Sequence, residues 1–265
     1  MANVVYDVNN FIIDRPLRGL MVSSSDSSLM WSINQITNPT LSITTDKVDA
    51  VDALGAKIMT FERAKNAEFS AENSIFDLGL YAAQAGSEKE IATETAKMIV
   101  PAFEEVDVVG EKITLKHTPN AQIAYIYELK GDSTIGVKYV NGSAASDTEF
   151  VHAEGSNEIT VPTGLATGSQ LFVRYDYESS KAVAVHNKGT EFPKAGIFYL
   201  EVLGADICDP TNLIHAYVRF GNAKLVSDVD ITFSTESTHS FTIQAMPDYC
   251  DKEKRLLSII IPDED

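Results

Sequence analysis

The sequence predicts a mainly β protein with one flanking helix and an inserted small β module. Short segments in which apolar and polar residues alternate recur along most of the chain, bounded by Gly, Pro, Asn or acidic residues. The clearest helical spacing of apolar residues lies in one stretch that ends at a glycine. The texture of the alternating segments changes after residue 103 and changes back near residue 187, which predicts a main domain and an insertion.

Strands are predicted from residue 29 onward. The first four are SLMWSINQI, PTLSITT, AKIMTFERA and KNAEFSA, and each alternates with a period of two. The preceding residues, 1–27, mix two short apolar patches with the polar run SSSDSS. This mixture predicts a terminal arm rather than a core element.

The connection between PTLSITT and AKIMTF is about ten residues long, whereas hairpin loops usually have about two to five. Acidic and apolar residues interleave in it, and apolar side chains on an isolated loop favour docking on another chain. A short helical turn folded onto the chain's own sheet is the alternative. The predicted contact residues are Asp46, Lys47, Val48, Asp49, Val51, Asp52 and Leu54.

A short helix is predicted after the fourth strand. Ser74 and Asp77 have the spacing of a capping box, and Gly86 supplies a C-terminal stop. Because a helix of roughly three turns is unstable alone in water, it should lie against the preceding sheet. Its predicted packing residues are Ile75, Leu78, Leu80 and Ala82.

The insertion is expected to span residues 104–186 and the main domain residues 1–103 and 187–265. Within the insertion, short alternating strands are separated by turn signals at roughly 8 to 12 residue spacing, as in small sandwiches and barrels. After Gly189 longer alternating segments resume and run to an acidic C-terminus. A C-terminal arm is expected there.

The charge balance restricts the possible partners. The chain has 38 acidic and 21 basic residues, a formal net charge of −17. Such a surface disfavours stable binding of nucleic acid or anionic membranes, although it allows transient passage of DNA. The N-terminus lacks a signal-peptide pattern and no segment approaches 18 apolar residues. We therefore expect assembly in the cytoplasm and no membrane insertion.

Signatures of catalysis are missing from the sequence. There is no GxSxG, P-loop or GxGxxG motif, and the five histidines never fall at HxxxH or HxH spacing. Cys208 and Cys250 have no CxxC partner and are expected to be reduced and buried. The carboxylate pair Glu104 and Glu105 is expected to be solvated. We expect no enzyme activity, no metal and no cofactor.

Several aromatic residues leave two interpretations open. At strand periodicity they are more often core residues or cross-strand pairs, but they are also suitable as platforms for stacking sugars. The residues are Trp31, Tyr125, Tyr127, Phe172, Tyr175 and Tyr177.

Two stretches resemble the major tail (tail tube) proteins of long-tailed bacteriophages. The first contains NPTLSITTDKVDAVDALG followed by AKIMTFERAKNAEFSAENSIFDLGLYAAQAGS, and the second runs from FPKAGIFYLEVLGADICDP to HSFTIQAMPDYC. Together they cover a little over half of the chain. The resemblance lies in an ordered series of strands with one helix rather than in a short diagnostic motif.

The resemblance implies a tail-tube-type β-sandwich or barrel that forms hexameric rings stacked into a hollow tube for genome ejection. The long loop would reach the neighbouring ring, terminal arms would lock subunits, and residues 104–186 would be an immunoglobulin-like decoration. Implied partners are copies of the chain itself, the tape measure, baseplate and tail terminator proteins, a sheath if the tail contracts, and DNA only in transit. The implied location is the virion tail.

Two other readings of the sequence remain open. A β-rich adhesin or receptor-binding module would bind host glycans through the tyrosines of the insertion, as a monomer or trimer. A tail terminator or related head-tail protein would stop at a single ring.

Overall fold

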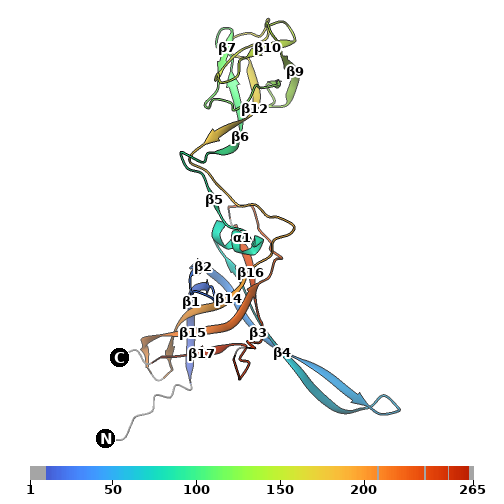
Figure 1. The fold of residues 1–265 in the computed structure, drawn as a ribbon, viewed down its shortest axis with the longest axis vertical. Coiled ribbons are helices and arrows are strands. Elements are labelled where there is room, and N and C mark those ends of the chain that lie inside the picture. Colours follow the sequence, from blue (N-terminus) through green and yellow to red (C-terminus); the bar gives the residue numbers. More distant parts are fainter. Residues whose placement is uncertain (1–9, 208, 236, 250, 263–265) are drawn as a thin grey trace. The chain divides into compact units, whose positions relative to one another are not determined.

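The computed structural model describes residues 10–207, 209–235, 237–249 and 251–262 of the 265-residue chain. The chain forms two compact units (Figure 1): a first unit of Met1–Lys89 with Val185–Asp265, and a second unit of Glu90–Ala184. The boundary expected between residues 103 and 104 falls inside strand β6 (Met98–Asp107), which belongs to the second unit. Cys208 and Cys250 lie outside the described residues.

The described residues confirm the prediction of a mainly β fold with one α-helix. The first unit is built on an eight-stranded sheet in the order β2-β1-β14-β15-β16-β4-β3, with β17 paired to β15. Two residues connect the edge strands β2 and β3, so the sheet curls into a near-barrel. The strands are β1 (Phe11–Val22), β2 (Leu29–Ile33), β3 (Ile36–Val51), β4 (Lys57–Asn73), β14 (Ala195–Asp206), β15 (Asp209–Leu225), β16 (His239–Ala245) and β17 (Ser258–Ile260).

The core of the first unit is an aromatic cluster inside the curled sheet. Phe198 is fully buried, and its ring centroid lies 5.7 Å from those of Phe69 and Phe220 and 5.8 Å from that of Trp31. These side chains meet because alternate residues of each strand point to the same face. Trp31 is therefore a core residue, as the commoner of its two interpretations expects.

Strand β1 corrects the expectation that residues 1–27 form a terminal arm. Residues 11–22 lie within the sheet, paired with β2 on one side and β14 on the other, and Met21 is fully buried. Register shifts beside Arg15 and Pro16 interrupt the alternation that would have revealed the strand. Residues 1–9 lie outside the described residues.

The helix α1 (Leu78–Ala85) begins later than the sequence predicts. Asp77 caps it, because its side chain accepts a 2.8 Å hydrogen bond from the Leu80 N–H. Ser74 directly follows β4, and its N–H donates a 3.0 Å hydrogen bond to the carbonyl of Gln35 in the connection between β2 and β3. The capping box is therefore absent, whereas Gly86 ends the helix in the left-handed conformation as expected.

The helix packs through two of the four residues expected to do so, with a third half-buried. Leu80 and Ala82 are buried, and Leu78 is half-buried. Ile75 precedes the helix and is 57% exposed, so it does not contribute to helix packing within the chain.

A buried histidine joins the helix to the sheet. His239 of β16 is fully buried, and its Nε2 lies 2.6 Å from Oε1 of Gln84 on α1. The Gln84 amide also donates to the Ser240 carbonyl at 3.0 Å, and the Phe76 ring stacks on His239 at 5.4 Å. Burial lowers the pKa of His239, against an opposing contribution from Asp77.

This lowered pKa predicts that the first unit loses stability in mild acid. The unfolded chain binds a proton on His239 more readily than the folded chain, so stability falls as pH drops below about 6.5 towards the folded pKa. His239→Gln should reduce the loss of melting temperature between pH 7.5 and pH 5.0. His117→Gln, at an exposed position in the second unit, is the control. An unchanged pH dependence in His239→Gln would contradict this role.

The second unit is one seven-stranded sheet in the order β6-β12-β8-β9-β10-β11-β7. Strand β10 pairs with β9 through its first two residues and with β11 through its last two, so it carries the sheet around a corner over one core. The short strands β5 (Glu90–Ile91) and β13 (Val183–Ala184) pair where the chain enters and leaves the unit. The other strands are β7 (Lys112–Thr114), β8 (Tyr125–Leu129), β9 (Ile135–Asn141), β10 (Glu149–His152), β11 (Glu158–Thr160) and β12 (Gln170–Ser179).

Glu104 corrects the expectation of a solvated carboxylate pair. It is only 7% exposed, and it accepts hydrogen bonds from the Tyr175 hydroxyl and from the Lys116 N–H at 3.2 Å. Burial and this carboxylate together raise the pKa of Tyr175. Glu105, one residue further along the strand, is exposed. Glu104 is therefore a buried hydrogen-bonding residue of the second unit, and only Glu105 is solvated as expected.

Candidate assembly interface

The most unusual feature of the first unit is the outer part of the β3–β4 hairpin. Strand β16 pairs with β4 only as far as Glu68. Beyond that point, among the described residues, β3 and β4 form strand hydrogen bonds only with each other. We call residues 43–66 the hairpin arm. Figure 1 shows the hairpin arm projecting away from the rest of the first unit. All of its side chains are exposed except the half-buried Thr45 and Ala50.

The predicted ten-residue loop is in fact the end of this hairpin. Strand β3 continues to Val51 and β4 begins at Lys57, so both a long loop and a helical turn were wrong. The turn comprises residues 52–56, and Asp52 organises it by accepting hydrogen bonds from the N–H groups of Leu54 and Ala56, at 2.9 and 2.8 Å. Gly55 has a φ of +84°, which favours glycine. Asp52 thus has a role within its own chain.

Asp49 also has intrachain partners. Its carboxylate lies 2.6 Å from the Lys57 ammonium and accepts a 2.6 Å hydrogen bond from the Thr60 hydroxyl. The hydrogen bond from Lys57 is the main reason that the pKa of Asp49 is lowered. These contacts cross-link the two strands and give one face of the distal hairpin arm a polar character.

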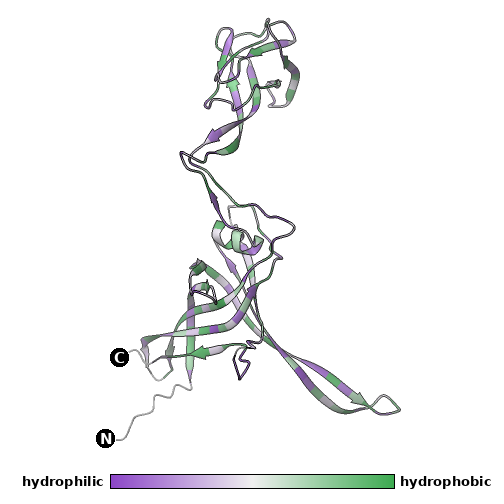
Figure 2. Cartoon of the chain, viewed as in Figure 1, coloured by the Kyte–Doolittle hydropathy of each residue, from purple (hydrophilic) through white to green (hydrophobic). Residues whose placement is uncertain are grey.

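The opposite face of the distal hairpin arm is apolar. Val48 pairs with Phe61, and Ala50 pairs with Met59, so these four side chains share one face. Val48, Met59 and Phe61 are 46%, 55% and 50% exposed. Figure 2 shows the resulting mixture of hydrophobic and hydrophilic residues along the hairpin arm. A two-stranded ribbon has no core of its own, so this apolar face stays in contact with water within the described part of the chain.

The structure separates the predicted contact residues into groups. Val48 lies on the apolar face, and Leu54 at the tip is 94% exposed. Val51 pairs with Lys57 and, by its position in the alternation, lies on the face opposite Val48. The sequence did not predict Met59 and Phe61 as members of this apolar face, because AKIMTFERA has the pattern of an ordinary strand. The signal that could have identified them is their two-residue spacing, which places both on one face.

Both edges of the sheet in the first unit lack a further strand partner among the described residues. Strand β2 forms one edge with five residues and β3 forms the other with sixteen. A long unpaired edge is a template for another strand, and soluble proteins usually shorten or cover it. The 16-residue edge of β3 is consistent with pairing to another chain.

A groove is lined in part by β2. It has a volume of about 890 Å³ and lies between β2, the turn at residues 23–28 and helix α1. Two buried polar atoms of its lining, Trp31 Nε1 and Ser87 Oγ, have no hydrogen-bond partner in the part of the chain that the structure describes. The charged residues of the lining are Asp77, Glu88, Lys89 and Lys194, and the Lys194 ammonium lies 3.7 Å from the Glu88 carboxylate.

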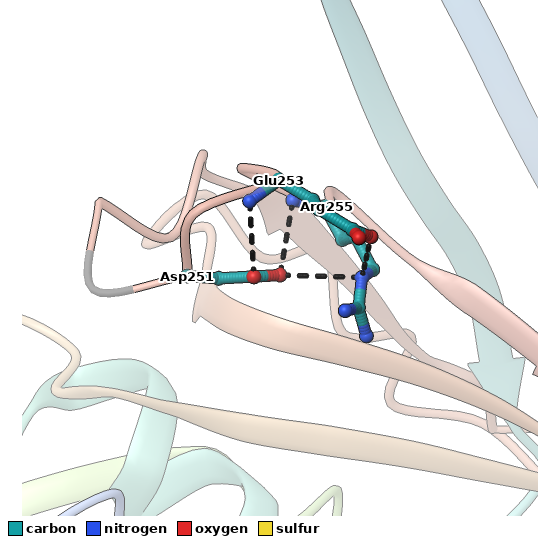
Figure 3. A network of polar contacts seen from close by, with 3 residues as sticks. All are labelled: Asp251, Glu253 and Arg255. Atoms are coloured by element: carbon teal, nitrogen blue, oxygen red, sulfur yellow. Dashed lines mark hydrogen bonds and ion pairs between the residues drawn. The ribbon is translucent and has the colours of Figure 1, made fainter.

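The expected C-terminal arm is partly held in the chain's own sheet. Asp251 accepts hydrogen bonds from the N–H groups of Glu253 and Arg255 (Figure 3). The Arg255 guanidinium forms ion pairs with the carboxylates of Asp251 and Glu253. The hydrogen bonds from these two N–H groups lower the pKa of Asp251, and the one from Glu253 contributes most. The closed turn leads into β17, which pairs with β15 of the same chain. Residues 263–265 lie outside the described residues.

Among the described residues, no group of three or more His, Cys, Asp or Glu side chains is placed to hold a metal ion. Within the same residues, no helix is long and apolar enough to cross a membrane.

The first unit combines a curled sheet, whose edge strands β2 and β3 have no further strand partner among the described residues, with a projecting hairpin arm, so the chain is a mainly β protein. The chain belongs to the YomU/Tube protein family, whose model matches residues 13–258. No curated protein matches the chain. The family supports the resemblance to phage tube proteins and indicates a structural component of the tube type.

Proposed function

We propose that the chain is the subunit of a phage tail tube, in which six copies close into a ring and successive rings stack into a hollow conduit for the genome. The single observation that carries this proposal is the hairpin arm, an exposed ribbon with one apolar face. Ring closure would pair the free edges of neighbouring near-barrels, which removes the edges from solvent. The role is structural and not catalytic.

The apolar face of the hairpin arm would join one ring to the next. Burial of Val48, Met59 and Phe61 removes apolar area from water, worth about 25 cal/mol per Å². Asp46, Lys47 and the tip residue Leu54 would contribute at the margin of this contact. Asp49 and Asp52 would act indirectly, since they hold the hairpin in shape.

The net charge fits a conduit for DNA. Acidic side chains facing a channel repel phosphates, so DNA would pass without sticking. The tape measure, baseplate and tail terminator proteins, and a sheath in a contractile tail, would be the other partners. The location would be the virion tail.

Sedimentation velocity of the purified chain over a concentration series tests this proposal. A tube subunit should shift from small species to rings and large polymers as its concentration rises. A single ring that never extends would favour a terminator instead. A monomer at every concentration would contradict the proposed function.

Glycan binding by the second unit is a second candidate function, because a groove of about 360 Å³ opens in its sheet. Strands β8 and β12 pair as far as Tyr127 and Phe172 and then separate. The groove between them is lined by Tyr125, which is 46% exposed, and by Arg174 and Asp176, which form a 2.9 Å ion pair. Such a set can stack on a sugar ring and bind its hydroxyls.

Tyr125→Ala should therefore weaken binding of neutral oligosaccharides by about three- to tenfold, the value of one aromatic contact. The measurement is saturation-transfer NMR of the full chain with maltotetraose and chitotetraose. Tyr249→Ala is a matched control, because both tyrosines are exposed and each has a lysine ammonium over its ring, at 3.7 Å for Tyr125 and 5.0 Å for Tyr249. No binding by the unmodified chain, or equal effects of the two substitutions, would exclude this function.

A further inference from the structure

We infer that one face of the sheet in the second unit binds an extended, neutral glycan chain of β-1,4-linked sugars. The inference rests on the glycan binding proposed for this unit and deepens it, because it names the class of glycan and extends the site beyond the groove. We call the face of β6, β12, β8 and β9 that points away from the core the outer face. The opposite face holds core residues such as Leu171 and Ile126, which are fully buried.

Four aromatic side chains lie on the outer face. Phe172 pairs with Tyr127, and Tyr125 lies two residues from Tyr127 on β8, so these three share one face. Phe103 pairs with Arg174, which lies two residues from Phe172 on β12, so Phe103 is on this face as well. We call the four aromatic residues the aromatic band. The aromatic band crosses three neighbouring strands of the sheet.

The aromatic band is exposed and ordered. Phe103 is 67% exposed and Tyr125 is 46% exposed, whereas Phe172 and Tyr127 are half-buried. The rings of Phe103 and Phe172 stack with their centroids 6.4 Å apart, and the Lys138 ammonium lies 3.7 Å from the centroid of the Tyr125 ring. Rings that are held before a ligand arrives lose little conformational entropy on binding.

The groove of about 360 Å³ supplies polar groups next to the aromatic band. Tyr125 and Tyr127 belong to both the groove lining and the aromatic band, so the two surfaces are continuous. The lining also includes Asn120 and Gln122, and side-chain amides are suited to the hydroxyls of a sugar. A sugar chain combines apolar C–H faces with hydroxyls around the ring. This combination matches an aromatic band beside a polar groove.

The charges of the site favour a neutral ligand. On the four strands of the outer face, the charged residues are Glu105, Asp107, Lys138, Arg174, Asp176 and Glu178. Asp176 forms a 2.9 Å ion pair with Arg174, and Glu178 forms one of 3.3 Å with Lys97. Glu105 and Lys138, which flank the aromatic band on β6 and β9, have opposite charges. Because the chain also has a net charge of −17, a polyanionic glycan would be repelled.

The site is longer than one sugar ring. Strand β12 lies between β6 and β8, so Phe103 and Tyr125 are two strand spacings apart, about 10 Å at ~4.8 Å per spacing. One ring stacked on Tyr125 would not reach Phe103. A β-1,4-linked chain is extended and presents the C–H faces of successive rings, so it can contact both residues at once. An α-1,4-linked chain coils and turns its successive rings away from a single sheet face.

Saturation-transfer NMR titrations of the full chain test the inference. The dissociation constant for chitohexaose should be at least tenfold lower than that for chitobiose, about the value of one or two further aromatic contacts. Maltohexaose should bind no more tightly than maltose. Phe103→Ala should weaken the binding of chitohexaose by about three- to tenfold and leave the binding of chitobiose unchanged.

Phe192→Ala is the matched control, because Phe192 is 63% exposed, close to Phe103, and belongs to the first unit. Equal affinities for chitobiose and chitohexaose, both weakened by Tyr125→Ala, would overturn the extended site and leave glycan binding in the groove standing. No binding of either glycan would overturn both. Assembly that is lost in Phe103→Ala and kept in Phe192→Ala would assign the outer face to a contact between copies and overturn the inference.

Discussion

Removal of the hairpin arm should abolish assembly and leave the fold intact. Thr45 and Lys65 are a paired position near the base of the hairpin arm, so an Asn-Gly turn can replace residues 46–64 between them. The replaced side chains are all exposed except the half-buried Ala50, and their loss should change the free energy of unfolding little. In sedimentation velocity, the shortened chain should stay small at concentrations where the full chain forms large polymers.

A point variant separates the apolar face from the length of the hairpin arm. Phe61→Asp places a charge on the face shared with Val48 and Met59, and it should raise the concentration needed for assembly strongly. Phe233→Asp is its control, because Phe233 is 88% exposed and lies outside the hairpin arm. Polymers formed by the shortened chain at the normal concentration would contradict the role of the hairpin arm.

Phe198→Ala should unfold the first unit at much lower temperature. Phe198 is fully buried and its ring neighbours Trp31, Phe69 and Phe220, so truncation leaves a cavity that costs about 3–5 kcal/mol. For a unit of this size the melting temperature should fall by roughly 10 °C. Calorimetry of the full chain provides the measurement.

The two units should respond separately to such truncations. Phe150 is fully buried in the core of the second unit, so Phe150→Ala should lower the melting of that unit and leave the first unaffected. Each variant is thus the control for the other. One shared transition that moves equally in both variants would contradict the description of two compact units, each with its own core.

The sequence predicted those elements whose signal is local. Alternation identified strands such as β14, and a glycine suited to positive φ marked the end of α1 at Gly86. Strand β1 was missed because register shifts around Arg15 and Pro16 break the period of two. The helix start was misplaced, because Ser74 and Asp77 are both good caps and only the hydrogen bond of Ser74 to the distant Gln35 decides between them.

The candidate interface was only partly predictable. Aspartates at three-residue spacing are untypical of a strand, so the sequence did not predict that β3 continues to Val51. In addition, a register shift after Thr45 changes which residues share a face. The pairing of Val48 with Phe61 therefore required the structure. Contacts between distant segments, such as Gln84 with His239 and Glu104 with Tyr175, depend on tertiary packing and leave no trace in local spacing.

Negative-stain electron microscopy of the purified full chain at rising concentration tests the central claim most directly. A chain that completes its sheet and docks its hairpin arm on other copies should form hollow cylinders of uniform diameter. Discrete small particles at every concentration, with no rings or cylinders, would contradict the account.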